Sequence, residues 1–417
     1  MNESNKIKNF SFVACLTMVN AFALMIAYVC GAYFKMDAAG LLFYKSQDGH
    51  CQIPQDSIGL HCFGDYSAIR FQSIFDSPLP PGNVYPPSTR IFLLPFHYAD
   101  KLYGFRLGLF LFLAISAICL LFPIVVATRE MSTRDRLFLA SLCGITTYPF
   151  LFTLDRGNPI ALAVPGIFIF IRVILKHDRK NYYWAVLALC SSVAIKPQFI
   201  LFFALFFLLR EYKLFFKSLI AGLLTILIPF LIYFSRSWLE FQNWLSAVSD
   251  WGQSLSMESN YPANYSLMHF FVFIGIPALV CTVLVIVSGL FFLLYRWNTK
   301  RTHLIDVMVL TVLIAFSNPI NYGYYTILFI PVLAIYLVRP VEDGFNSVLI
   351  KIGLVLTVSP LLIPSQWVTN SQLLDNKTFN LAPLFVVGTW ILFIIVQIPI
   401  LIVNSTSRGS SKDSREI

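Results

Sequence analysis

Ionisable and amide side chains interrupt a very apolar sequence in six separate segments. A carboxylate in such a group can accept a proton from a hydroxyl, and arginine or lysine can stabilise a departing phosphate. These residue types therefore predict group transfer from a donor that carries a phosphate. The candidate residues are Asp65, Tyr85, Arg90, Asp155, Arg156, Asn158, Lys196, Asn264, His269 and Asn318.

Each segment also has a purely structural interpretation. The Tyr-Pro-Pro stretch at 85–87 can end one segment and direct the next, because proline fixes φ and disfavours helix before it. Asp155 and Arg156 can form a simple ion pair, and Lys196 can extend from a helix end toward the interface. Asn264 can cap a helix. The two interpretations differ in whether the segments must share one face of the protein.

The composition places the chain in a membrane. Of its 417 residues, 57% are hydrophobic and only 12% are charged, with a mean hydropathy of +0.72. Soluble domains carry about 25% charged residues. We therefore expect an all-α polytopic membrane protein. Its formal net charge of +9 is then attributed to basic cytoplasmic loops rather than to affinity for nucleic acid.

Apolar runs long enough to span a bilayer, or nearly so, recur along the chain. Twelve candidates are found, and ten to thirteen spans are expected. They belong to one predicted membrane domain at 1–403, which is followed by a disordered cytoplasmic tail at 404–417. The runs lie near 10–32, 107–127, 137–153, 158–175, 182–195, 197–209, 214–234, 265–295, 303–317, 323–338, 347–363 and 382–403.

Basic residues assign an orientation to these runs. With both termini in the cytoplasm, every cytoplasmic connection carries lysine or arginine, as positive-inside insertion requires. Long outer loops then fall at 33–106, 235–264 and 364–381, and all six polar segments map to the outer side. Chance would scatter them over both faces, so we expect an extracytoplasmic active site. The second loop has apolar residues at the spacing of an amphipathic interfacial helix, namely Trp238, Phe241, Trp244 and Leu245.

Cysteine and histidine positions match no familiar metal pattern. The six histidines are dispersed, and Cys51 and Cys62 follow no common zinc spacing. These two cysteines lie in the polar stretch after the first apolar run, so they are candidates for a disulfide in an oxidising compartment. We predict a reaction without metal or cofactor, such as sugar transfer from a lipid-linked phosphate donor.

Four motifs together resemble glycosyltransferase family 87. They are an aspartate in the first outer loop, Tyr-Pro-Pro at 85–87 with Pro95, Arg-Gly-Asn at 156–158, and Lys-Pro at 196–197. The resemblance covers most of residues 10–340. The roles it implies are Asp65 as general base with Asp37 as runner-up, Arg90, Arg156 and Lys196 on the leaving phosphate, and Asn158 and Tyr85 on the donor.

This family consists of membrane enzymes with the GT-C fold that use polyprenyl-phosphate-linked sugars. Its known members are α-mannosyltransferases and arabinofuranosyltransferases of cell-envelope glycolipids and glycans. The resemblance implies inverting transfer of a hexosyl or pentosyl residue, with mannose favoured, at the outer face of the plasma membrane. A transporter or flippase of a lipid-linked sugar is an alternative, although it would call for charges near the bilayer midplane. A scaffold or envelope polymerase with a similar outer cavity is another.

Overall fold

The computed structural model describes residues 10–23, 63–70, 84–257, 303–316, 323–338 and 345–358, and the single positions 25, 277, 280, 283, 286, 287 and 289. Within these residues all regular structure is helical, which confirms the all-α prediction for them. A first helix covers Phe10–Ala23. The others, with η for 3₁₀ helices, are α2 (Gly64–Arg70), α3 (Pro87–Tyr103), α4 (Phe105–Ala127), α5 (Thr133–Ile145), α6 (Tyr148–Arg156), α7 (Ile160–Leu175), η1 (Arg179–Asn181), α8 (Tyr182–Ile195), η2 (Pro197–Phe203), α9 (Ala204–Leu208), α10 (Tyr212–Leu227), η3 (Ile228–Arg236), α11 (Ser237–Met257), α14 (Leu304–Phe316), η4 (Gly323–Leu328), α15 (Phe329–Val338) and α16 (Phe345–Val358).

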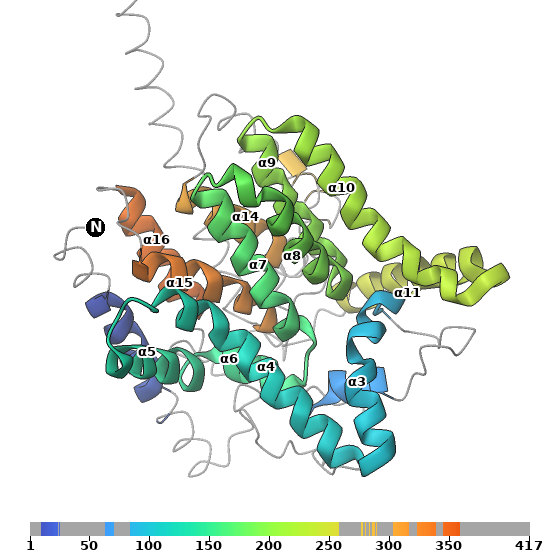
Figure 1. Ribbon diagram of the computed structural model, residues 1–417, viewed down its shortest axis with the longest axis horizontal. Coiled ribbons are helices and arrows are strands. Elements are labelled where there is room, and N and C mark those ends of the chain that lie inside the picture. Colours follow the sequence, from blue (N-terminus) through green and yellow to red (C-terminus); the bar gives the residue numbers. More distant parts are fainter. Residues whose placement is uncertain are drawn as a thin grey trace, which may run out of the picture.

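The centre of the bundle is the pair α7 and α8, which lie side by side, with α4 against α7 and α10 against α8 (Figure 1). Both central helices are apolar along most of their length, and most of α7 is buried. A helix that is apolar all round must be enclosed by other helices or by lipid. The bounds of α7 and α8 correspond closely to the apolar runs predicted at 158–175 and 182–195.

Gly166 allows α7 and α8 to approach each other closely. A Cβ atom added there would lie 2.1 Å from the carbonyl oxygen of Ala188 and 2.4 Å from Oγ of Ser192. The Ser192 hydroxyl crosses the same contact and donates to the Ala163 carbonyl at 2.7 Å. Small residues and interhelical hydroxyl bonds are typical of helix contacts in membranes.

Replacing Gly166 with alanine is expected to destabilise the protein by about 1–3 kcal/mol, because the methyl group overpacks the contact. Thermal unfolding of the purified chain in detergent measures this loss. Gly289→Ala is the matched control, because a Cβ there meets no described atom within 4 Å. That control should be neutral or stabilising by up to about 1 kcal/mol. Equal melting temperatures for Gly166→Ala and the wild type would contradict the close contact.

Helix α3 lies inside the predicted first outer loop, where no helix was expected. Pro86 precedes the helix with extended backbone, and Pro87 occupies its first turn, where a missing N–H costs nothing and the fixed φ suits the helix. Leu93 and Phe96 are buried, whereas Leu102 is exposed. The two prolines therefore begin a helix with one packed face, rather than only ending a loop.

The run predicted at 137–153 is not one straight helix. It is divided between α5 and α6, which meet at an angle of 61°. At the break, the Thr146 and Thr147 hydroxyls donate to the carbonyls of Leu142 and Cys143 at 2.5 and 2.6 Å. The Leu142 carbonyl also accepts the backbone N–H of Thr146 at 3.1 Å, so the threonine hydroxyls add hydrogen bonds to the last turn of α5.

Two helical stretches of the described chain are long and apolar enough to cross a membrane, or three if the bent α5–α6 pair is one span. They are Leu107–Ala127 and Tyr212–Asp250, although Phe234 interrupts the second with φ 51° and ψ −120°. The remaining apolar helices are shorter. The count of twelve spans stays a prediction, and so do the domain limits.

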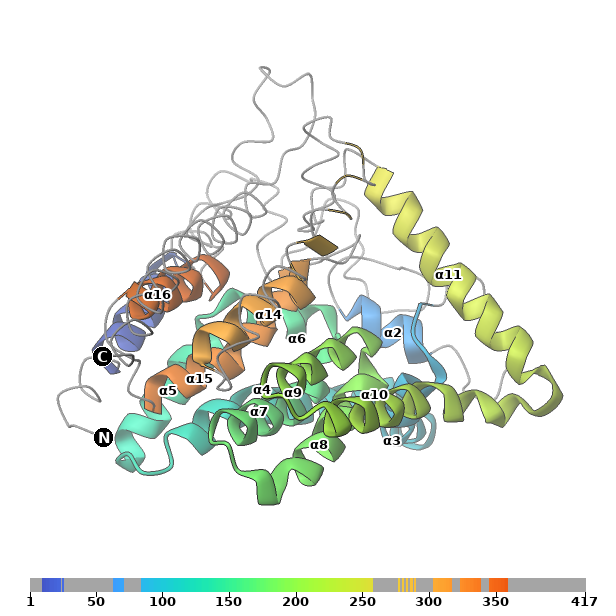
Figure 2. The same ribbon diagram turned by 90° about the horizontal axis from the view of Figure 1, so that it is seen from above.

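Helix α11 occupies the predicted interfacial segment. Figure 2 shows it leaving the bundle at η3 and running along one side. Trp244 is buried, and its Nε1 donates to the Val84 carbonyl at 3.2 Å, whereas Trp238 is 68% exposed. The helix therefore has one packed face and one exposed face, and the packed face contacts Val84, the residue before the Tyr-Pro-Pro stretch.

Candidate active site

Asp65 lies in the first turn of α2, a short helix that is fixed at several points. The backbone N–H of Phe63 donates to the Asp155 carbonyl at 2.7 Å. The hydroxyl of Tyr66 donates to Oδ2 of Asp100 on α3 at 2.6 Å, and its ring packs against Phe112 of α4. Contacts with three other helices therefore set the position of the Asp65 carboxylate.

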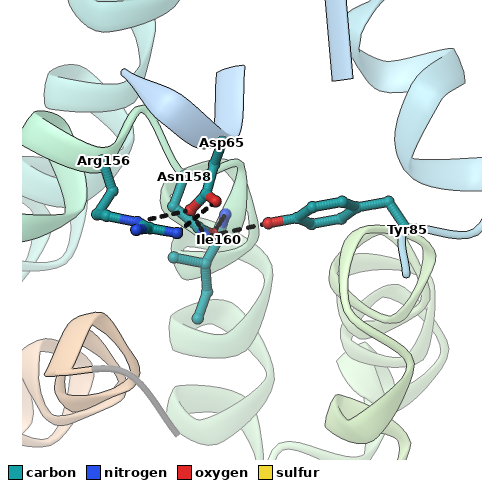
Figure 3. Close-up of polar contacts among 5 residues, drawn as sticks. All are labelled: Asp65, Tyr85, Arg156, Asn158 and Ile160. Carbon is teal, nitrogen blue, oxygen red and sulfur yellow. Dashed lines mark hydrogen bonds and ion pairs between the residues drawn. The ribbon is translucent and has the colours of Figure 1, made fainter. Parts of the chain in front are cut away.

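Arg156 ends α6 and forms a two-point ion pair with Asp65 (Figure 3). Its Nη2 lies 2.6 Å from Oδ1 of Asp65, and its Nε lies 3.2 Å from Oδ2. Gly157 follows with a left-handed φ of 61°, and a Cβ there would lie 2.9 Å from Cβ of Tyr66. Only glycine combines this backbone with so close an approach to α2, so the turn holds Arg156 against the carboxylate.

Asn158 connects Asp65 to Tyr85. Its Nδ2 donates to Oδ2 of Asp65 at 2.6 Å and to the Tyr85 hydroxyl at 3.2 Å, and its Oδ1 accepts from the Ile160 N–H at 3.0 Å. The bond from Ile160 fixes which way the amide faces, because only an oxygen can accept it. Among the described residues, Oδ2 of Asp65 accepts two hydrogen bonds and Oδ1 only one. Oδ1 therefore keeps capacity for another donor.

Tyr85 and Lys196 form the neighbouring part of the site. Nζ of Lys196 lies 4.4 Å from the ring centroid of Tyr85 and 5.6 Å from that of Tyr325 on η4. Lys196 is only 8% exposed, so the two rings supply part of the stabilisation that water would give its charge. Burial, and next the Asp65 carboxylate, raise the pKa of Tyr85 well above its usual range. The phenol therefore stays neutral.

The backbone at Lys196 is fixed by α3. Lys196 is extended, with φ −140° and ψ 104°, between the end of α8 and Pro197. The Ser88 hydroxyl donates to the Ala194 carbonyl at 2.6 Å, and the Thr89 hydroxyl donates to the Ile195 carbonyl at 2.9 Å. The first turn of α3, which the prolines begin, therefore positions the lysine.

The predicted site residues fall into three groups. Asp65, Tyr85, Arg156 and Asn158 are linked by hydrogen bonds, and Lys196 joins them through the Tyr85 ring. Arg90 and Asp155 are buried on α3 and α6 at 2% and 0% exposure, close in sequence to these groups. The others lie outside the described residues, namely Asp37, Cys51, Cys62, Asn264, His269 and Asn318.

Sequence reasoning missed Tyr325 and the Tyr66–Asp100 pair. Tyr325 belongs to an aromatic stretch beside the polar 317–321 segment, which was the available signal. Tyr66 directly follows Asp65, but nothing in the sequence relates it to Asp100. As for metals, the described part of the chain brings together no three His, Cys, Asp or Glu side chains that could hold an ion.

Comparison with known proteins gives one match. A sequence model of glycosyltransferase family 87 matches residues 83–317, more than half of the chain. Tyr85, Arg156, Asn158 and Lys196 fall inside the matched region, whereas Asp65 precedes it. Neither the curated proteins nor the solved structures contain a match. This apolar, helical chain therefore belongs to glycosyltransferase family 87 and is a membrane glycosyltransferase.

Proposed function

We propose that this enzyme, built on a GT-C fold, transfers a hexosyl or pentosyl residue, with mannose favoured, from a polyprenyl-phosphate donor. The acceptor is a hydroxyl of a cell-envelope glycolipid or glycan, and transfer takes place on the extracytoplasmic face of the plasma membrane. The observation that carries the proposal is the cluster of Asp65, Arg156, Asn158 and Lys196. A carboxylate lies there beside cationic groups that suit a phosphate. Family membership also favours a transferase over a transporter.

In the proposed reaction, Asp65 is the general base. Oδ1 accepts the proton of the acceptor hydroxyl while the hydroxyl oxygen forms a bond to the anomeric carbon. The bond between that carbon and the phosphate oxygen breaks, and its electron pair leaves with polyprenyl phosphate. Attack opposite the leaving group inverts the anomeric centre.

The cations of the site stabilise the charge that develops on the leaving phosphate. Lys196 is suited to this role because its ammonium is held in place before the reaction begins. Arg90 and Arg156 add positive charge from α3 and α6. Asn158 keeps the carboxylate oriented, and its Oδ1 can accept a further hydrogen bond from a hydroxyl of the donor sugar.

A transfer assay on membranes tests this function. Wild-type membranes receive polyprenyl-phosphate mannose or polyprenyl-phosphate arabinofuranose, and product is compared with Asp65→Asn and Asp37→Asn membranes. We expect transfer from the mannose donor, with loss in Asp65→Asn and retention in Asp37→Asn. Asp250→Asn, on the exposed side of α11, is the matched control. Transfer only from the arabinofuranose donor would replace mannose with arabinofuranose as the transferred sugar. Full activity in both aspartate variants would refute Asp65 as the proposed base.

A further inference from the structure

A pocket with a charged rim lies at the end of α7 that is remote from the Asp65 cluster. Its volume is about 160 Å³, enough for about five water molecules. It lies where the C-terminal ends of α4, α7 and α15 meet. The 16 residues of α7 extend about 24 Å, so this pocket is separate from the Asp65 cluster. Its charged lining is Arg129, Glu130, Arg172 and Lys176, and apolar residues such as Phe168 and Ile335 form the rest.

The cations of this pocket are not needed to complete the helix ends. The N–H groups of His177 and Asp178 donate to carbonyls in the last turn of α7 at 3.0 and 3.3 Å, and His177 has a φ of 52°. This is the usual closure of a helix C-terminus. At the end of α4, Thr128 donates to the Ile124 carbonyl through both its N–H and its hydroxyl, at 2.9 and 2.7 Å.

Among the described residues that line the pocket, cations outnumber carboxylates. Three cations and Glu130 give the lining a formal charge of +2. Among the described residues, neither Arg129 nor Arg172 has a carboxylate oxygen within ion-pair distance. The Arg172 guanidinium lies 5.9 Å from the ring centroid of Phe168, a contact that keeps this long side chain at the pocket. The guanidinium groups of Arg129 and Arg172 therefore line one cavity with N–H donors that can bind an anion.

We propose that this pocket binds the phosphate of an anionic membrane lipid. Guanidinium groups match phosphate oxygens with paired hydrogen bonds, and basic pockets between membrane helices suit anionic headgroups. The partly exposed apolar side chains of the lining, Met131 and Val338, offer contacts for an acyl chain, which a free phosphate ion would not use. The site is distinct from the proposed transfer reaction and does not depend on it.

Native mass spectrometry of the full chain in detergent tests the proposal. The protein is incubated with phosphatidylglycerol, with phosphatidylethanolamine of the same acyl chains, or with inorganic phosphate. We expect selective retention of phosphatidylglycerol, and at least about tenfold lower retention in Arg129→Gln/Arg172→Gln, since each lost bond to a charged group is costly. Arg134→Gln/Lys180→Gln removes the same charge from exposed positions outside the pocket, and should retain the lipid as the wild type does.

A gain-of-binding variant guards against misfolding as an explanation. Glu130 is exposed and is the one carboxylate among the lining residues, so Glu130→Gln should raise phosphatidylglycerol retention by about fivefold. Equal retention of the two lipids, or equal losses in the two double variants, would overturn the site. An unchanged Glu130→Gln variant would do the same. Retention of inorganic phosphate as strong as that of phosphatidylglycerol would overturn the lipid as the ligand.

Discussion

Asp65→Asn is expected to lower kcat for sugar transfer by about 10²–10⁴-fold, the usual contribution of a positioned general base. Asparagine matches aspartate in shape but cannot take the proton of the acceptor hydroxyl at neutral pH. Initial rates at saturating donor and acceptor measure this effect. The donor KM should change much less than kcat, because the role proposed for Asp65 is on the acceptor side of the reaction.

Stability must be separated from catalysis in this variant. The Arg156 side chain is only 7% exposed, and loss of one partner from a buried ion pair costs about 3–5 kcal/mol. The double variant Asp65→Asn/Arg156→Gln removes the cation as well, so it should regain much of the lost thermal stability while transfer remains low. If the double variant regained near wild-type transfer, Asp65 would serve only to pair the Arg156 charge and would not be the base, and Arg156 would not be needed on the phosphate.

Lys196→Met is expected to lower kcat/KM for the donor by about 10²–10³-fold, comparable to loss of one preorganised group that stabilises developing charge. Methionine is similar in length and leaves the space between the Tyr85 and Tyr325 rings filled. The expected effect is therefore electrostatic rather than a packing defect. Steady-state kinetics over a range of donor concentrations provide the measurement.

Lys351→Met is the matched control for that variant. Lys351 also places its ammonium over an aromatic ring, 5.7 Å from the centroid of Phe12, but it lies on α16, outside the cluster. Its replacement should leave donor kinetics unchanged. Tyr325→Phe keeps the ring and should preserve kcat/KM, whereas Tyr325→Leu should lower it. Wild-type kcat/KM in Lys196→Met would contradict a role for this lysine on the phosphate.

Much of the helical framework could be predicted because the removal of apolar side chains from water dominates its stability. The limits of α7 and α8 follow from long apolar runs that end at polar or proline residues. The same logic singled out Asp65, Arg156 and Lys196, since charges in an apolar chain are costly without a function or a partner. Their convergence was expected from shared orientation alone.

The remaining features depend on contacts between residues distant in the sequence. The α3 helix was missed because 33–106 is polar on average, and the packed side of α3 is apparent only once α2 and α4 lie against it. The break between α5 and α6 falls at two threonines that remain compatible with a continuous helix. The Tyr66–Asp100 bond and the position of Tyr325 are tertiary, and no local pattern encodes them.

The hydroxyl bonds from Ser88 and Thr89 to the end of α8 have a consequence for how substrates reach the site. They fill the last carbonyls of α8, next to Pro197, which has no N–H to offer. To separate α3 from α8 would leave two buried carbonyls unsatisfied, at about 1–3 kcal/mol each. Opening that seam is costly, so we expect the proposed lipid-linked sugar to enter and leave on another side of the cluster.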